Sequence, residues 1–289
     1  MSAETENRSF FDLCYAERQF IVVVDDETVQ PAKGKGKIKE NGLDYKALGL
    51  KAFGLKALEV GVKLVLPTFM GPVLIAETAI ELYNALNKLK DAGFNALPIA
   101  RSEAKFIEFP PGHPRNNVLY AAHPTIKEAY FPVAQFHRIV FEHKFSEAIE
   151  LLMSLGAKRI EVEHVSGWSK DFCAKLDVSI PYADIEAGAS ISANAKAASK
   201  LLFHANLSGN INPKLPENLV WYHHEPTWRQ IAQGRLNYGL KDFSLSIRYE
   251  DDYGINAGLK MSASKSGLDI GGKFEDHQST IWRIVGEFN

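Results

Sequence analysis

The chain has 289 residues, of which 46% are hydrophobic and 24% charged, a composition typical of a folded globular protein and not of a disordered one. Its formal net charge of -2 argues against a protein that binds nucleic acid with its whole surface, and we expect no nucleic-acid partner. The two cysteines, Cys14 and Cys173, are too few for a disulfide framework or a cysteine-rich metal site.

The N-terminal residues 1–18 are polar and acidic, without the basic start and apolar run of a signal peptide. We therefore expect a cytoplasmic protein, which associates with a membrane if its later apolar segments contact lipid. The β-branched run from Gln19 to Val24 that follows predicts a strand.

Lysines alternate with other residues, two of them glycines, in residues 31–42. One interpretation is a solvated linker. The other is a polybasic segment drawn to phosphates or anionic lipid, where each lysine contributes about 1 kcal/mol. The glycine and lysine spacing does not match a phosphate-binding P-loop.

An apolar region follows, in which no residue between Lys63 and Glu77 carries a charge. Residues 44–66 favour a helix, although the alternation of apolar residues over 58–66 makes a strand a competitor. Prolines and glycines then break the chain before a second helix, predicted over 73–92. The uncharged run is shorter than the roughly 20 residues that a membrane-spanning helix needs. We predict an apolar helical hairpin over 44–92. It forms either part of the core or an oligomer interface, or it contacts a membrane after a conformational change.

The side chains that we expect to contact a membrane lie in the lysine-rich segment and in this hairpin. They are Lys33, Lys35, Lys37, Lys39, Leu64, Leu66, Phe69, Met70, Val73 and Leu74.

Short strands and one long helix are predicted in the middle of the chain. Residues 105–109 and 118–122 are expected to form strands, and 159–165 another. Between them, a stripe of apolar residues predicts a long amphipathic helix over 132–155, closed by Gly156. With the hairpin, these elements make residues 1–166 a mixed α+β part.

A strictly alternating run begins at Ile185 and continues to Ala197, and residues 201–207 alternate in the same sense. The segment 185–207 is thus either one long strand or a hairpin turning near residues 198–200. A transmembrane strand needs about 9–11 residues, so the run is long enough. Its apolar side is mostly alanine, which also suits close packing within a sheet.

The last part, residues 167–289, is expected to be mainly antiparallel sheet, and could form one continuous domain with the first part. A short helix is predicted over 227–236, with Trp228 and Ile231 on its buried side. Four strands with short connections then predict an antiparallel β-meander: 243–249, 255–263, 268–274 and 280–288. The fold class is α+β.

The histidines are the main candidates for chemistry. His204, His223 and His224 are weak metal-ligand candidates, because adjacent histidines on a strand point in different directions and no His-Glu-x-x-His spacing is present. Residues 113–143 contain four further histidines that could act as a general base, but no Ser, Cys or Asp stands at a diagnostic spacing. We expect neither a metal nor a cofactor, and the pattern favours a protein that is not an enzyme.

These patterns lead to three hypotheses. The first is a membrane-interacting, pore-forming protein that uses segments 44–92 and 185–207, with an anionic membrane surface and further copies of itself as partners. The second is a soluble homo-oligomeric binding or assembly module, whose apolar hairpin is core or interface. The third is an enzyme using the His113–His143 region. The general plan of the chain, a sheet with amphipathic segments, is similar to that of pore-forming proteins such as gasdermins and perforin-like proteins. This resemblance concerns the plan alone, and no residues are matched.

Overall fold

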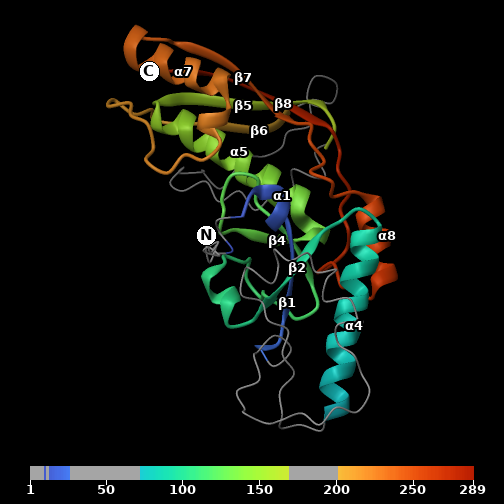
Figure 1. The fold of residues 1–289 in the computed structure, drawn as a ribbon. Coiled ribbons are helices and arrows are strands. Elements are labelled where there is room, and N and C mark those ends of the chain that lie inside the picture. The colour runs from blue at the N-terminus through green and yellow to red at the C-terminus, as the bar shows by residue number, and fades with distance from the viewer. Residues whose placement is uncertain (1–9, 11–12, 27–71, 169–200) are drawn as a thin grey trace, which may run out of the picture. The chain divides into compact units, whose positions relative to one another are not determined.

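Two four-stranded sheets organise the part of the chain that the computed structural model describes, residues 10, 13–26, 72–168 and 201–289 (Figure 1). The chain divides into two units, each containing one sheet. The first unit comprises 1–136 and 254–275, and the second comprises 137–253 and 276–289. The combination of helices with largely antiparallel sheets confirms the α+β class. The division differs from the expected boundary at residues 166 and 167, because residues 157–166 belong to the sheet of the second unit.

The sheet of the first unit has the order β2-β1-β3-β4. Its strands are β1 (Phe20–Val24), β2 (Ala96–Ala100), β3 (Leu119–Ala122) and β4 (Tyr130–Pro132). β1 is parallel to β2 and antiparallel to β3, and all five of its residues are buried. The strands expected at 19–24 and 118–122 are confirmed. β2 was not predicted, because it contains Pro98; an edge strand tolerates proline, since its outer side needs no ladder donor.

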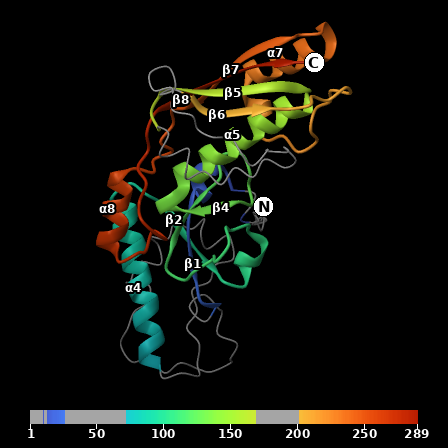
Figure 2. The same ribbon diagram turned by 180° about the vertical axis from the view of Figure 1, so that it is seen from behind.

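Helix α4 (Pro72–Asp91) confirms the second helix of the predicted hairpin. It buries Leu82, Ala85, Leu86 and Leu89, and it ends before Gly93, whose φ of 93° a side chain would strain. The first arm of that hairpin, residues 44–66, lies outside the described residues, so the hairpin stays a prediction. α4 runs beside α8 (Ala257–Ser266), as the view from behind also shows (Figure 2). A short helix, α1 (Tyr15–Arg18), precedes β1.

The strand expected at 105–109 is wrong. The chain forms a 3-10 helix, η2 (Glu103–Phe106), followed by a single bridge from Glu108 to Ala129. Ala104 and Ile107 are buried three residues apart, which fits a helical turn, whereas Phe106 is 75% exposed. In a strand, Phe106 would lie on the same face as the buried Ala104, two residues before it. The apolar run alone did not distinguish a strand from a helical turn.

The four-stranded meander is also wrong, because two of its four strands are absent. The expected strand at 255–263 is helix α8, and residues 268–274 contain only the isolated bridge from Asp269 to Val118. In that second segment Gly271 and Gly272 have φ values of 82° and 150°, which interrupt an extended strand. The first and last strands are confirmed as β7 (Asp242–Tyr249) and β8 (Thr280–Phe288), which pair directly with each other.

The sheet of the second unit has the order β6-β5-β8-β7, and every pair is antiparallel. It adds β5 (Ala157–Ser166) and β6 (Leu201–Asn206) to the strands already named, and β5 confirms the strand expected at 159–165. The run 185–197 lies outside the described residues.

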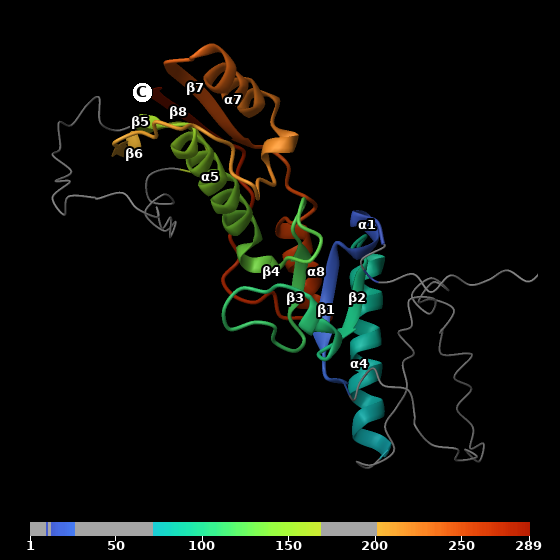
Figure 3. The same ribbon diagram turned by 90° about the vertical axis from the view of Figure 1, so that its left-hand side faces the viewer.

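Two helices cover one face of this second sheet (Figure 3). The long helix expected at 132–155 is confirmed as α5 (Phe136–Ser154), preceded by a 3-10 turn, η3 (Val133–Gln135). Its Phe141 and Phe145 rings lie 4.7 and 5.3 Å from the Trp282 ring of β8. α7 (Pro226–Tyr238) confirms the predicted short helix, and its Arg235 lies over the ring of Phe288, six residues after Trp282 on the same side of β8.

The opposite face of the second sheet is polar. Arg283 on β8 donates a hydrogen bond from Nε to the Glu163 carboxylate on β5, at 3.0 Å. Arg159 makes a similar contact with Glu161 along β5, with an Nε–Oε1 distance of 3.1 Å. A sheet with one buried and one solvated face is the arrangement expected of antiparallel strands.

Candidate functional site

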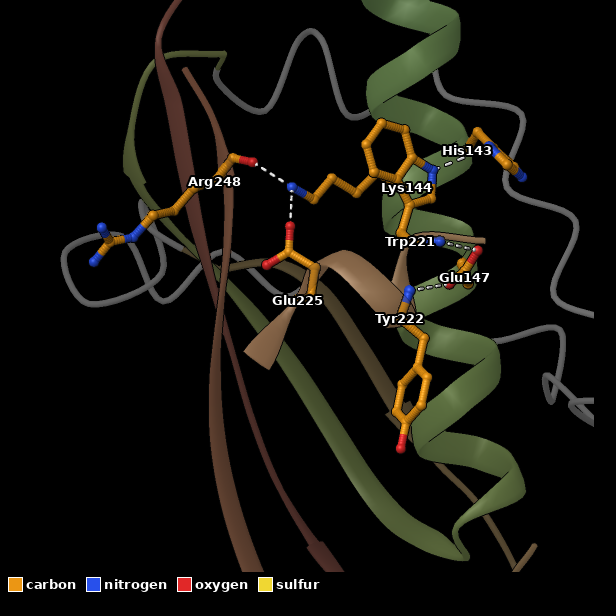
Figure 4. Close-up of polar contacts among 7 residues, drawn as sticks. All are labelled: His143, Lys144, Glu147, Trp221, Tyr222, Glu225 and Arg248. Carbon is orange, nitrogen blue, oxygen red and sulfur yellow. Dashed lines mark hydrogen bonds and ion pairs between the residues drawn. The ribbon is translucent and has the colours of Figure 1, made fainter. Parts of the chain in front are cut away.

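A buried polar cluster lies on α5 in the second unit (Figure 4). We call it the α5 latch. It consists of His143, Lys144 and Glu147 on the helix, and of residues 220–225 and the Arg248 carbonyl, which they hold. Glu147 follows Lys144 by three residues and His143 by four, so its side chain neighbours both of theirs on the helix surface.

Glu147 anchors the latch. Its side chain is 5% exposed, and its carboxylate accepts hydrogen bonds from three consecutive backbone amides, those of Val220, Trp221 and Tyr222, at 2.8, 3.0 and 2.8 Å. Figure 4 shows the bonds from Trp221 and Tyr222. These amides open the 3-10 helix η4 (Tyr222–His224) and have no partner within it. The glutamate of one helix thus caps the start of another, through charge-assisted hydrogen bonds.

Lys144 connects three elements. Its ammonium forms an ion pair with Glu225, the residue that precedes α7, and donates to the backbone oxygen of Arg248 on β7, at 2.9 Å. It also lies 5.2 Å from the centre of the Trp221 ring, within cation–π range. A lysine that is only 8% exposed is tolerated because its charge is paired and its hydrogens are used.

His143 completes the latch through the indole of Trp221, whose Nε1 donates to His143 Nδ1 at 3.1 Å. An indole nitrogen can only donate, so His143 Nδ1 is the acceptor and carries no proton. Burial lowers the pKa of His143, while the nearby Glu147 carboxylate acts in the opposite direction. The latch therefore contains a neutral imidazole.

These hydrogen bonds and the ion pair join the polar groups of the latch to one another and to backbone atoms of the same unit. Such an arrangement holds the segment 220–225 against α5 and β7. It presents neither a nucleophile beside a base nor a set of converging metal ligands. Sequence reasoning missed it, because Lys144 and Glu147 resemble ordinary solvated positions of an amphipathic helix.

A second polar cluster lies in the first unit, at the carboxyl ends of the parallel strands β1 and β2, where many α/β proteins bind ligands. Asp25 accepts a hydrogen bond from the Asn116 amide at 2.5 Å, and Asn116 in turn accepts one from Arg101 at 2.9 Å. Asp26 accepts from the backbone of Ser102 at 2.7 Å. These bonds tie together the loops that follow the two strands.

The four histidines between 113 and 143 bond to different partners. His113 Nδ1 lies 2.7 Å from the Tyr120 hydroxyl, and burial lowers the pKa of His113 and raises that of Tyr120. His123 Nδ1 accepts from two backbone amides that follow it, those of residues 125 and 126. His137 Nδ1 lies 2.8 Å from the Tyr249 hydroxyl. Two of these histidines belong to the first unit and two to the second, so neither unit contains the group of four.

The three metal-ligand candidates are not brought together into a site. His204 on β6 has its Nε2 3.9 Å from the Glu161 carboxylate, and His223 and His224 are exposed on η4. Among the residues that the structure describes, no three His, Cys, Asp or Glu side chains are placed to hold a metal ion.

Most of the predicted membrane contacts fall outside the described residues: Lys33, Lys35, Lys37, Lys39, Leu64, Leu66, Phe69 and Met70. Val73 and Leu74 belong to the first turn of α4. In the ranges 13–26, 72–168 and 201–289, no helix is both long enough and apolar enough to cross a membrane.

Comparison with known proteins gives no relative for this chain. It matches no protein-family model, no curated protein and no solved structure. The function must therefore be argued from the residues themselves.

Proposed function

We propose that this protein is a non-enzymatic, membrane-interacting protein that forms pores, using the amphipathic segments 44–92 and 185–207. The observation that carries the proposal is the pairing of β5 with β6. These strands are antiparallel neighbours, so both ends of the intervening segment, which holds the alternating run 185–197, lie at one end of the sheet. The two ends of this segment join neighbouring strands. A segment of alternating residues between such strands can therefore extend beyond the sheet as a two-stranded ribbon with one apolar face.

Two side chains at this end of the sheet support the proposal. Val165, near the end of β5, is 55% exposed, and Leu201, at the start of β6, is 38% exposed. Leu201 pairs with Glu163, two residues before Val165. Exposed apolar side chains would thus lie at both points where the proposed ribbon joins the sheet.

The segment between β1 and α4 supplies the second part of the proposal. It contains the lysines of residues 31–42 and the uncharged run that follows them. Clustered lysines are attracted to anionic headgroups over about a Debye length, and an adjacent apolar segment adds hydrophobic burial once contact is made. The protein would therefore bind anionic membranes in preference to neutral ones.

Dye release from liposomes tests the proposal. The purified full chain should release dye from vesicles containing phosphatidylserine, and much less from vesicles of phosphatidylcholine alone. Ile191→Asp places a charge on the apolar side of the run and should abolish release, because a charged side chain on the lipid-facing side of a transmembrane strand is destabilising. Ser192→Asp, one residue further on the polar side, is the matched control and should release dye as the unchanged chain does.

Two results would contradict the proposal. One is the absence of both dye release and pelleting with anionic vesicles at every protein concentration. The other is equal loss of release in both variants, because a ribbon with one lipid-facing side distinguishes adjacent positions.

A soluble homo-oligomeric assembly module is the second candidate. It is favoured by the polar face of the second sheet, where the partly exposed Arg283 and Glu163 form an ion pair that suits a polar protein partner. Size-exclusion chromatography with light scattering would then show a stable oligomer without lipid. Leu64→Asp would abolish its solubility, and the protein would not release dye. The third hypothesis, an enzyme using the His113–His143 region, has no described group of residues to carry a reaction.

A further inference from the structure

We infer that the α5 latch is sensitive to pH: protonation of His143 releases Trp221 and loosens residues 220–225 from α5. The inference goes beyond the proposed function, and it holds whether or not the protein acts on membranes. It concerns the second unit alone, in which all members of the latch lie.

The geometry of one hydrogen bond carries the argument. Trp221 Nε1 donates to His143 Nδ1 at 3.1 Å, and this requires a neutral imidazole with its proton on Nε2. A protonated imidazole carries hydrogens on both nitrogens, so two donors would face each other at this distance. Trp221 is 5% exposed, and a buried indole N–H without an acceptor is unfavourable. The protonated state therefore favours a structure in which the indole has moved.

Among the residues that the structure describes, the charges around His143 do not remove this conflict. Glu147, one turn further along α5, favours the protonated imidazole, but burial outweighs it and lowers the pKa of His143. Glu147 is occupied by three backbone amides, and Lys144 is paired with Glu225 at the start of α7. The nearby η4 adds two exposed imidazoles, of His223 and His224, and β7 adds Arg248, whose backbone oxygen accepts from Lys144.

The direction of the pH effect follows from the lowered pKa of His143. The folded latch binds the proton more weakly than the unfolded chain does, so its stabilisation is complete above the ordinary histidine pKa of about 6.5. It is lost progressively as the pH falls below that value toward the folded pKa. Histidine is the side chain whose ordinary pKa places its charge change in this range, so mild acidification acts on the latch through His143.

Amide hydrogen exchange of the full chain tests the inference at about pH 7.5 and about pH 5.5, after correction for intrinsic exchange rates. Peptides covering 217–225 should lose about tenfold of their protection on acidification, relative to peptides of β7. His143→Asn keeps an acceptor near the Nδ1 position but does not titrate, so its protection should not change with pH. His204→Asn, an exposed histidine on β6 that lies outside the latch, is the matched control and should behave as the unchanged chain does.

The inference is overturned if acidification leaves 217–225 protected in the unchanged chain, or if His143→Asn loses protection to the same extent. The indole N–H resonances of the unchanged chain provide a test that does not depend on any variant folding well. The Trp221 resonance, assigned from the spectrum of Trp221→Phe, should shift with the same midpoint as the His143 ring. A Trp221 resonance that is insensitive to pH, or that titrates with a different midpoint, contradicts the inference.

Discussion

Glu147 holds the segment before α7 through three hydrogen bonds. Its buried carboxylate accepts from three backbone amides, and Glu147→Ala leaves all three without their acceptor. We expect this change to lower the free energy of unfolding by about 3–5 kcal/mol, and Glu147→Gln, which keeps one oxygen acceptor, by about 1–3 kcal/mol. Urea unfolding followed by tryptophan fluorescence measures both.

Glu150→Gln is the control for this prediction, because Glu150 is an exposed carboxylate on the same helix. Its effect should stay within about 0.5 kcal/mol. A Glu147→Ala protein as stable as the Glu150→Gln protein would show that water replaces the carboxylate at these amides.

The latch marks a limit of sequence reasoning at the residue scale. The apolar stripe of α5 was predictable from its spacing, and Phe145 and Ile149 are buried as expected. The burial of Lys144 and Glu147 was not, because their partners lie more than 70 residues later, in the segment 220–225. Only the folded chain brings three consecutive backbone amides to a carboxylate, and no local sequence pattern predicts this contact.

Helix α8 shows why an alternating pattern can mislead at the element scale. Apolar residues at every second position from 255 to 263 include a subset at every fourth position, and Ile255, Leu259 and Ala263 are fully buried. Met261, which a strand would bury with them, is 56% exposed. The deciding signals were Asn256 and Gly267 at the ends of the helix, residue types that cap helices as well as form turns. By contrast, β7 and β8 bury their alternating apolar residues, so the same kind of pattern predicted these two strands correctly.

The N-cap of α8 gives a prediction at the same scale. The Asn256 side chain accepts hydrogen bonds from the backbone amides of Gly258 and Leu259, at 2.9 and 3.3 Å. Asn256→Ala should lower the free energy of unfolding by about 1 kcal/mol, because both amides lose their acceptor. Asn256→Asp keeps the oxygen and should be close to the unchanged chain in thermal unfolding. Equal losses in the two variants would contradict a capping role.

On the scale of the whole molecule, the chain passes between the two units three times, after residues 136, 253 and 275. The sequence pattern suggested a single boundary near residue 167, between a mixed α+β part and a part that is mainly sheet. Such a pattern indicates whether a segment is helix or strand, but not the unit to which that segment belongs. The segment 254–275 follows β7 of the second unit, yet it completes the first unit. Its helix lies against α4, and Asp269 exchanges backbone hydrogen bonds with residues 117 and 119, at 3.0 and 2.8 Å.

This interleaving predicts that residues 1–136 do not fold alone. Without 254–275 the fragment exposes the surface of α4 that α8 covers, and it leaves the backbone groups of residues 117 and 119 without these partners. Joining 254–275 to 1–136 through a long Gly/Ser linker restores both, and should give a folded protein with dispersed amide resonances and slow exchange in β1 and β3.

Two controls separate this account from a general effect of added chain. Leu259→Asp in the joined fragment places a charge at a position that is fully buried, and should abolish folding. Met261→Asp, on the exposed side of the same helix, should leave the fragment folded. If 1–136 alone gave dispersed resonances and slow exchange in β1 and β3, the segment 254–275 would be an addition to a complete unit. Residues 1–136 would then be sufficient to specify the fold of the first unit.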